Sequence, residues 1–201
     1  MPAKLPREFY TRSNVLLIAR QLLGCTLVVP AEDGARISGR IVETEAYMGP
    51  EDKAAHSYGN RRTPRTETMF AAGGTAYVYF IYGMYYQFNA VTNRENVPHA
   101  ILLRALEPLE GIERMHERRP VKRDKDLTSG PGKLCQALGL DRSYDKEDLL
   151  GERVWIEAAE KRVAPRRIMS GVRIGIDYAE EYRDKPWRFW IKDNPYVSRL
   201  R

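Results

Sequence analysis

Two β-prone, aromatic runs flank a Tyr-Gly pair near the middle of the chain. Residues Thr75–Ile81 precede Tyr82 and Gly83, and residues Met84–Val91 follow them. Aromatic and β-branched residues favour strands, and two strands joined by a two-residue turn form a hairpin. The sequence therefore predicts an antiparallel hairpin with an aromatic side chain at its tip. A fold that contains this hairpin must include antiparallel β-structure.

Further segments carry strand or helix signals along the rest of the chain. Apolar residues at helical spacing predict a helix over Arg12–Leu23, and an Asp-Gly pair between Thr26–Val29 and Ile37–Tyr47 predicts a second hairpin. The other predicted elements are strands over Ala100–Leu106, Val154–Glu157, Arg166–Ile176 and Arg188–Ile191, and helical segments over Glu110–Arg118, Lys133–Leu138 and Ala179–Arg183.

The connections between these elements decide the predicted fold class. Most strands are joined by tight turns, and the helices cluster instead of alternating with strands. Such an order is typical of α+β proteins. We therefore expect a single compact α+β domain over residues 1–201, with a curved, mostly antiparallel sheet, flanking helices and a protruding aromatic hairpin.

Composition excludes several classes of protein. An apolar fraction of 43% with 12 Tyr is ample for a packed core, which excludes a disordered chain. Because the chain has no long apolar run and no signal-peptide layout at its N-terminus, we expect neither a membrane span nor secretion. The net charge of +6 fits a polyanionic partner, but an ordinary basic surface would give the same value.

Metal-binding spacing is missing from the sequence. Cys25 and Cys135 are far apart, and the three histidines, His56, His99 and His116, show no zinc-site spacing relative to them. We expect both cysteines to be buried structural residues, and the sequence requires no metal or other cofactor.

Tyrosine is concentrated in the predicted central hairpin, where five of the ten residues 77–86 are Tyr. Alternation along a strand places Tyr77 and Tyr79 on one face and Phe80 and Tyr82 on the other. A platform for stacking nucleic-acid bases is one interpretation. The alternative is a buried aromatic sheet whose hydroxyl groups reach water.

Carboxylates follow an apolar stripe on the predicted strand Ile37–Tyr47. Glu43 and Glu45 have the same parity as Ile37 and Ile41, so we expect them to continue that stripe and to be partly desolvated. A partly desolvated carboxylate suits a general base. A strand end that emerges into solvent is the alternative.

A long polar connection over Gly49–Gly74 separates this strand from the aromatic hairpin. It contains His56 and a cluster of arginines and threonines suited to phosphate contacts, including Arg61 and Thr63. Loops of this length inside a compact domain are usually functional. Each of these residues, taken alone, would also be ordinary on a protein surface.

Several motifs occur together and in order along nearly the whole chain, from about Glu8 to Val197. They are IVETEAYMGPEDKAAHS, TPRTETMF, YVYFIYGMYYQFN, LLRALEPLEG and SGPGKLCQALG. In this combination the chain resembles the alkyladenine (3-methyladenine, methylpurine) DNA glycosylase family. The resemblance implies a monofunctional DNA base-excision repair enzyme, which flips a damaged purine out of the duplex and hydrolyses its N-glycosidic bond with water, leaving an abasic site.

The same resemblance implies roles for individual residues. Glu45 matches the general base of the family, and Arg104 matches its partner in holding the attacking water. The residues matching the base-binding pocket are Tyr47, His56 and Tyr79 as walls around the flipped base, and Asn89 as the residue that obstructs normal guanine.

The resemblance also implies a surface that contacts DNA. Tyr82 matches the wedge that fills the vacated place in the duplex, and Arg61, Thr63, Met69 and Met84 lie in segments similar to the family's DNA-contacting surface. We accordingly expect double-stranded DNA with alkylated or deaminated purines as partner, no cofactor, and a monomer. The expected location is cytoplasmic, at the nucleoid of a bacterium or in the nucleus of a eukaryote.

Two other functions are compatible with the same residues. Glu43, Glu45 and the triplet 51–53 could form the carboxylate cluster and lysine of a metal-dependent nuclease. The basic charge and stacking aromatics alone would also fit a non-catalytic nucleic-acid-binding domain. A lyase activity would need an amine nucleophile, and Lys133 is the one lysine in a suggestive turn.

Overall fold

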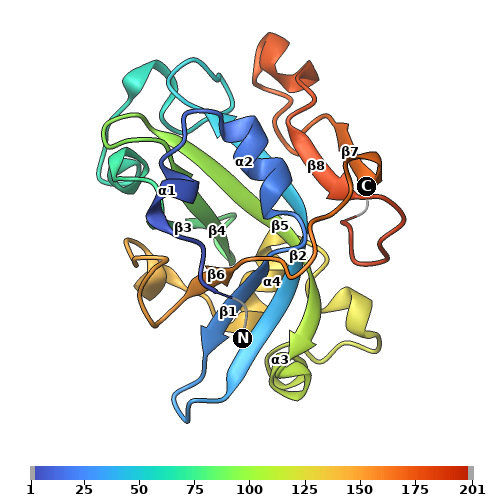
Figure 1. Ribbon diagram of the computed structural model, residues 1–201. Coiled ribbons are helices and arrows are strands. Elements are labelled where there is room, and N and C mark those ends of the chain that lie inside the picture. The colour runs from blue at the N-terminus through green and yellow to red at the C-terminus, as the bar shows by residue number, and fades with distance from the viewer. Residues whose placement is uncertain (1–2, 199–201) are drawn as a thin grey trace.

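The computed structural model describes residues 3–198, and within them eight strands form one sheet in which every ladder is antiparallel (Figure 1). The strands are β1 (Thr26–Pro30), β2 (Arg36–Met48), β3 (Ala76–Ile81), β4 (Tyr85–Thr92), β5 (His99–Glu110), β6 (Trp155–Glu157), β7 (Ile168–Gly171) and β8 (Arg188–Ile191). Their order is β3-β4-β5-β2-β1-β6. β1 pairs with the first half of β2, β8 pairs with its second half, and β7 pairs with β8.

Four α-helices surround the sheet in the described part of the chain. They are α1 (Arg7–Tyr10), α2 (Val15–Leu22), α3 (Ile112–Arg118) and α4 (Pro131–Leu138). Asn14 caps α2 by accepting a hydrogen bond from the Leu17 amide, which satisfies one of the free N–H groups of the first turn. Short 3-10 turns lie at Tyr58–Asn60, Glu67–Phe70, Asp124–Asp126, Arg142–Tyr144, Pro165–Arg167 and Glu180–Asp184.

The predicted α+β class, the antiparallel sheet and the aromatic hairpin are confirmed. One predicted element is partly wrong, because the strand expected over Arg166–Ile176 ends at Gly171. β7 pairs with the four residues of β8, and beyond this pairing the chain turns toward β2, where Arg173 becomes fully buried. Apolar residues continue to alternate in the sequence after Gly171, but these later residues have no partner strand, so they do not form one.

Two irregularities in the β2–β5 ladder decide which residues share a face. The register shifts between Ile41 and Glu43 and again between Glu43 and Thr44, so each strand carries one extra residue. A bulge of this kind reverses the alternation of side chains beyond it. The main core accordingly contains Ile41 but continues at Ala46. The expectation that Glu43 and Glu45 extend the apolar stripe is wrong.

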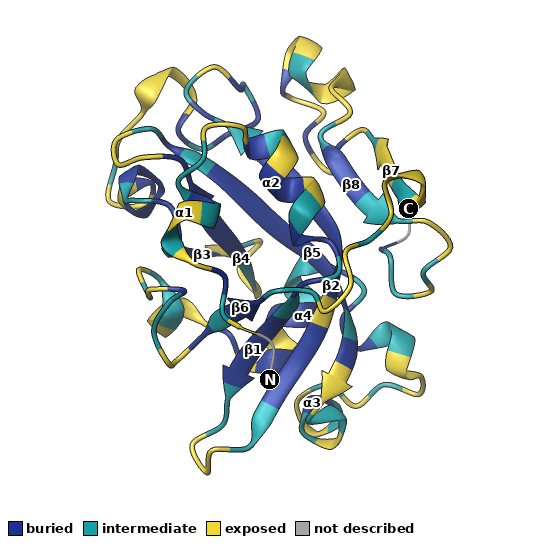
Figure 2. Ribbon diagram, viewed as in Figure 1, coloured by how far each residue is buried: buried dark blue, intermediate teal, exposed yellow. Residues whose placement is uncertain are grey.

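The two faces of the sheet are covered differently. On one face, α2 packs against β2 and β5, α4 packs against β4 and β5, and both helices contribute to the main core (Figures 1 and 2). On the other face lie two smaller clusters, formed with side chains from segments 54–70 and 176–182. This second face therefore carries the polar and aromatic side chains described below.

No helix among the described residues is long and apolar enough to cross a membrane.

Candidate active site

A row of side chains crosses four strands on the second face of the sheet. In the ladders, Glu45 lies opposite Leu102, Leu102 lies opposite Asn89, and Asn89 lies opposite Tyr77. Residues directly opposite each other on antiparallel strands share a face. The register thus brings together residues from β2, β5, β4 and β3 that are far apart in the sequence.

Glu45 is fully buried, and both of its carboxylate oxygens accept hydrogen bonds. The Tyr47 hydroxyl donates to Oε2 at 2.9 Å, and the Ile174 amide donates to Oε1 at 2.8 Å. Burial first, and then the charge of Glu45, raise the pKa of Tyr47 well above its usual value, so this phenol keeps its proton. Glu45 is consequently held in one orientation by donors on two different segments.

Arg104 joins Glu45 to a second buried carboxylate. Its Nη1 lies 3.3 Å from Glu45 Oε1, and its Nε donates to Glu43 Oε1 at 3.1 Å. Glu43 also accepts from the Ser198 amide and hydroxyl at 2.7 and 2.8 Å. Burial alone would lower the pKa of Arg104, but the attraction of Glu45 and Glu43 outweighs it, so the pKa is raised and the guanidinium stays charged.

A small cavity of about 80 Å³ opens beside this network. Of the residues predicted from the resemblance, the following line it: Tyr47, His56, Met69, Tyr79, Tyr82, Asn89 and Arg104. The His56 ring meets the Tyr79 ring edge to face, with centroids 4.6 Å apart. The structure therefore brings together one acid–base candidate, its arginine partner and several aromatic walls.

His56 is held by Tyr77, a residue to which the sequence analysis assigned no role of its own. Nδ1 of His56 lies 2.9 Å from the Tyr77 hydroxyl. Arg65 lies close to this hydroxyl, and its charge opposes the rise that burial produces in the Tyr77 pKa. Burial raises the pKa of Tyr77 to about 12, so the hydroxyl proton is present at neutral pH. In the tautomer that accepts this proton at Nδ1, His56 carries its own proton on Nε2.

His56 is expected to produce an acid-sensitive limb in the stability of the protein. Burial, and secondarily the charge of Arg65, lower the pKa of His56 to about 4. An unfolded histidine has a pKa of about 6.5, so between these values the unfolded state binds a proton that the native state excludes. The free energy of unfolding should therefore fall as the pH is lowered from about 6.5 to about 4.

Urea unfolding at a series of pH values measures this limb. Burial lowers the pKa of His99 as well, so the two histidines share the effect. In His56→Gln the slope between these pH values should be reduced but not abolished. An unchanged slope in this variant would show that the His56 imidazole is not kept neutral by its surroundings.

Asn89 is buried with a fixed orientation. Its Nδ2 donates to the Tyr77 carbonyl at 3.1 Å and more weakly to the Gln87 carbonyl at 3.5 Å. Since both bonds use the amide nitrogen, the carbonyl oxygen is the end left for a ligand. Asn89 thus presents a rigid polar group to the cavity.

Tyr82 occupies the tip of the aromatic hairpin in a strained conformation. Three residues, Tyr82, Gly83 and Met84, lie between the paired residues Ile81 and Tyr85, and Tyr82 and Gly83 both have positive φ, 54° and 67°. A bulky residue seldom adopts this region. The Tyr82 side chain is nevertheless 75% exposed, and Met84 beside it is 64% exposed. Backbone strain and an exposed aromatic ring together indicate that this tip makes contact with something outside the protein.

The remaining residues of the expected DNA surface lie around this cavity. Arg61 and Thr63 line a neighbouring hollow that shares His56 and Tyr178 with the cavity. Met84 lies on the hairpin tip and does not line the cavity. The structure therefore places all three near the cavity mouth but outside it.

The sequence analysis missed one entire wall of the cavity. Ile174, Gly175, Ile176 and Tyr178 line it from the segment after β7. The sequence analysis assigned most of this segment to a strand, and no local motif indicates that it lines a site. Its recognisable signal was Arg173, a charged residue inside an apolar alternation.

The carboxylates of the nuclease interpretation are paired with different cations. Glu43 and Glu45 contact Arg104, and Asp52 contacts Arg173. Lys53 instead bridges two exposed carboxylates of the turn at Glu180–Asp184. In the described part of the chain, no three His, Cys, Asp or Glu side chains converge. The nuclease interpretation thus loses the cluster on which it rested.

Lys133 lies away from the cavity. It belongs to α4, which packs on the face of the sheet that carries the main core. The cavity is on the other face, and no lysine of the described chain lines it. The geometry consequently offers Lys133 no access to a reaction at Glu45.

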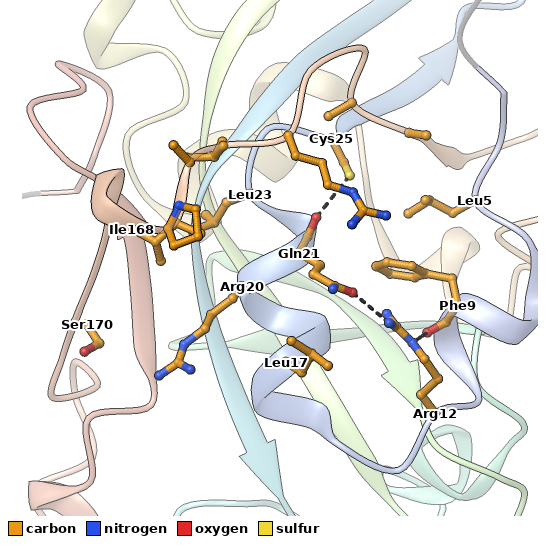
Figure 3. Close-up of a pocket in the computed structure, with 16 residues that line it drawn as sticks. Leu5, Phe9, Arg12, Leu17, Arg20, Gln21, Leu23, Cys25, Ile168 and Ser170 are labelled. Atoms are coloured by element: carbon orange, nitrogen blue, oxygen red, sulfur yellow. Dashed lines mark hydrogen bonds between the residues drawn. The ribbon is translucent and has the colours of Figure 1, made fainter.

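A larger hollow of about 750 Å³ lies elsewhere, between α1, α2 and the segment 158–165 (Figure 3). Its lining is mostly apolar and contains three arginines but no carboxylate or histidine. Cys25 lies in its wall, and burial raises the pKa of this thiol, which makes it a poor nucleophile. Size alone would favour this hollow, but the smaller cavity holds the groups that can transfer protons and stack on a base.

Comparisons with known proteins agree with this geometry. The family model described as methylpurine-DNA glycosylase (MPG) matches residues 8–195. A relative from Desulfitobacterium hafniense is 50% identical, with 97% of this chain and 98% of the relative covered. One from Clostridium acetobutylicum is 49% identical, with 98% of each covered. Both relatives carry names that provisionally describe them as 3-methyladenine DNA glycosylases. The chain belongs to the methylpurine-DNA glycosylase family.

Proposed function

We propose that this protein is a monofunctional DNA glycosylase that removes alkylated and deaminated purines by hydrolysis. The observation that carries the proposal is the buried Glu45, which lies directly behind a cavity walled by aromatic rings and contacts two residues that line it, Arg104 and Tyr47. A carboxylate in this position can accept a proton from water. It can also stabilise the positive charge that develops on the sugar as the glycosidic bond breaks.

The surroundings of Glu45 support its role as the base. The amide of Ile174 and the hydroxyl of Tyr47 orient the carboxylate, while Arg104 gives the attacking water a second polar neighbour. Positioning both groups before the reaction removes much of the entropic cost of bringing them together. The proposed product is an abasic site, with no break in the strand.

The aromatic residues account for capture of the base. A purine inside a duplex is inaccessible, so the enzyme must extrude it at a cost of a few kcal/mol. We assign Tyr82, exposed at the hairpin tip, to the space that the extruded nucleotide leaves. Tyr47, His56 and Tyr79 then hold the base, and Nε2 of His56 offers it a hydrogen bond.

Selectivity combines the chemistry of the lesion with the shape of the cavity. Purines alkylated at N3 or N7 carry a positive charge and leave easily, whereas hypoxanthine and ethenoadenine are neutral and need protonation as they leave. Asn89, with its fixed amide, occupies the space that the exocyclic amino group of a normal guanine would need. Every base with this amino group, 7-methylguanine included, therefore fits less well, and undamaged guanine is protected in addition by its stable bond.

Single-turnover release of base from duplexes containing one hypoxanthine or one ethenoadenine, with EDTA present, tests the proposal. We expect release of free base, and strand breaks only after treatment with alkali. Strand breaks without alkali would indicate an amine nucleophile and a lyase. Absence of release from these lesions and from methylated DNA would leave a binding domain as the better interpretation.

A further inference from the structure

A buried ion pair lies directly behind one wall of the proposed base pocket. Arg173 and Asp52 both have fully buried side chains, and Arg173 Nη2 donates to Asp52 Oδ1 at 2.8 Å. The Arg173 guanidinium lies over the Tyr47 ring at 4.8 Å and over the Trp187 ring at 5.0 Å. Tyr47 lines the cavity and Arg173 does not. One face of the Tyr47 ring therefore meets Arg173, and the other is available to a base.

Buried charges around the cavity are balanced in sign. Three are negative and three are positive, and each of these side chains is at most 8% exposed: Glu43, Glu45, Asp52, Arg104, Arg173 and Arg188. Arg65 also lies over an aromatic wall, 5.3 Å from the Tyr79 ring, but its side chain is exposed and its charge is screened by solvent. Asp52 is thus the buried group that cancels the charge behind Tyr47.

We propose that Asp52 is a specificity-determining residue, which allows cationic purines to stack on Tyr47 by neutralising Arg173 behind that ring. The inference rests on the proposed function and concerns its substrate class. A base stacked on the free face of Tyr47 would lie about 8 Å from the guanidinium, by adding one stacking distance to the 4.8 Å already present.

Without Asp52, repulsion from an uncompensated positive charge at this distance would weaken the binding of a cationic base about thirtyfold, at the effective dielectric constant of about 20 typical of protein sites. A neutral base does not experience this repulsion in the bound complex, before the proton transfer that accompanies its departure. Asp52 does not line the cavity, so it acts on the substrate only through Arg173 and the Tyr47 ring.

The test compares the affinities of one enzyme for duplexes with three different lesions, measured within a time too short for base release. Duplexes carry one 7-methylguanine, which is cationic, or one hypoxanthine or one ethenoadenine, which are neutral. In Asp52→Asn we expect the ratio of the affinity for 7-methylguanine to that for hypoxanthine to fall about thirtyfold relative to the unmodified protein. Replacing Arg173 by Met in the same chain should restore the ratio, because both buried charges are then gone.

Two controls separate charge from shape. Asp52 also accepts hydrogen bonds from the Met48 and Ala54 amides, so its replacement can shift the cavity wall. A shift in shape would change the ratio of hypoxanthine to ethenoadenine, which we expect to stay constant. Asp177→Asn removes an exposed carboxylate from the segment that carries Arg173, and it should leave all ratios unchanged.

Several outcomes would overturn the inference. An equal loss for cationic and neutral lesions in Asp52→Asn would do so, as would a ratio that the double variant fails to restore. If Asp52→Asn does not accumulate as folded protein, Arg173→Met alone serves as the test. In this variant the affinity ratio of 7-methylguanine to hypoxanthine should rise, because the negative charge of Asp52 is then uncompensated and attracts the cationic base. Failure of the unmodified protein to release any base would instead contradict the proposed function.

Discussion

Replacement of Glu45 by Gln is expected to lower the single-turnover rate of base release by about a thousandfold or more. General-base catalysis contributes about 10²–10⁴ in rate, and electrostatic stabilisation of developing charge can add to this. Gln has nearly the shape of Glu but is uncharged. Its carbonyl oxygen can take the place of Oε1, which faces both the Ile174 amide and Arg104, and its amide nitrogen then faces the Tyr47 hydroxyl. The change removes charge and proton acceptance while preserving volume.

The measurement is release of hypoxanthine from a duplex with enzyme in excess, together with the affinity for the same DNA. Affinity should change by less than about threefold, because Glu45 acts mainly on the transition state. Glu113→Gln, the same substitution at an exposed position of α3, is the matched control and should leave the rate unchanged. A Glu45→Gln variant within tenfold of the unmodified rate would remove Glu45 from the mechanism.

Replacement of Arg104 by Met is expected to reduce the free energy of unfolding by about 3–5 kcal/mol, which is the usual cost of removing one partner from a buried ion pair. Glu45 would keep its bonds from Tyr47 and Ile174, and Glu43 its bonds from Ser198, but two buried negative charges would lose the guanidinium between them. Arg188 remains 3.5 Å from Glu43, so Glu45 is the buried carboxylate left without a paired cation, and such a desolvated charge is costly. The loss should therefore exceed that from a typical surface ion pair.

Urea unfolding of two variants measures the difference. Arg40 is the matched control, since it lies on β2 and pairs with Glu107 at 3.5 Å, but both side chains are partly exposed. Arg40→Met should cost less than about 1 kcal/mol. Adding Glu43→Gln to Arg104→Met should recover part of the stability, because the network then holds one negative and one positive charge, Glu45 and Arg188. Equal losses for Arg104→Met and Arg40→Met would contradict the buried network.

Local signals in the sequence were sufficient for the order of elements and for most of the pocket. β-Propensity and the turn chemistry of Tyr82 and Gly83 predicted the hairpin, and helical spacing after Asn14 predicted α2. These signals depend on neighbouring residues and survive without tertiary contacts. The roles of Tyr47, His56 and the other pocket residues came from motifs that resemble a known family, and the structure places those pocket residues around one cavity.

The alternation of side chains along a strand did not predict correctly which face of the sheet carries Glu43 and Glu45. Counting by two from Ile41 places Glu43 and Glu45 on the apolar stripe, but one extra residue in each of β2 and β5 reverses the alternation. A bulge depends on the partner strand, so a single strand read alone does not reveal it. The same irregularity leaves Arg104 as the extra residue of β5, next to both carboxylates.

By itself the sequence determined the α+β class, the aromatic hairpin and the candidate residues for the chemistry. Strand and helix propensity, turn type and sequence motifs all depend on residues that are close together in the chain. Only the tertiary structure decided how the candidate residues are oriented. Ile174 reaches Glu45 across 129 positions, and Arg173 reaches Asp52 across 121. Contacts over such separations arise from the packing of whole segments, so the charge behind Tyr47 and the orientation of Glu45 become visible only in the folded chain.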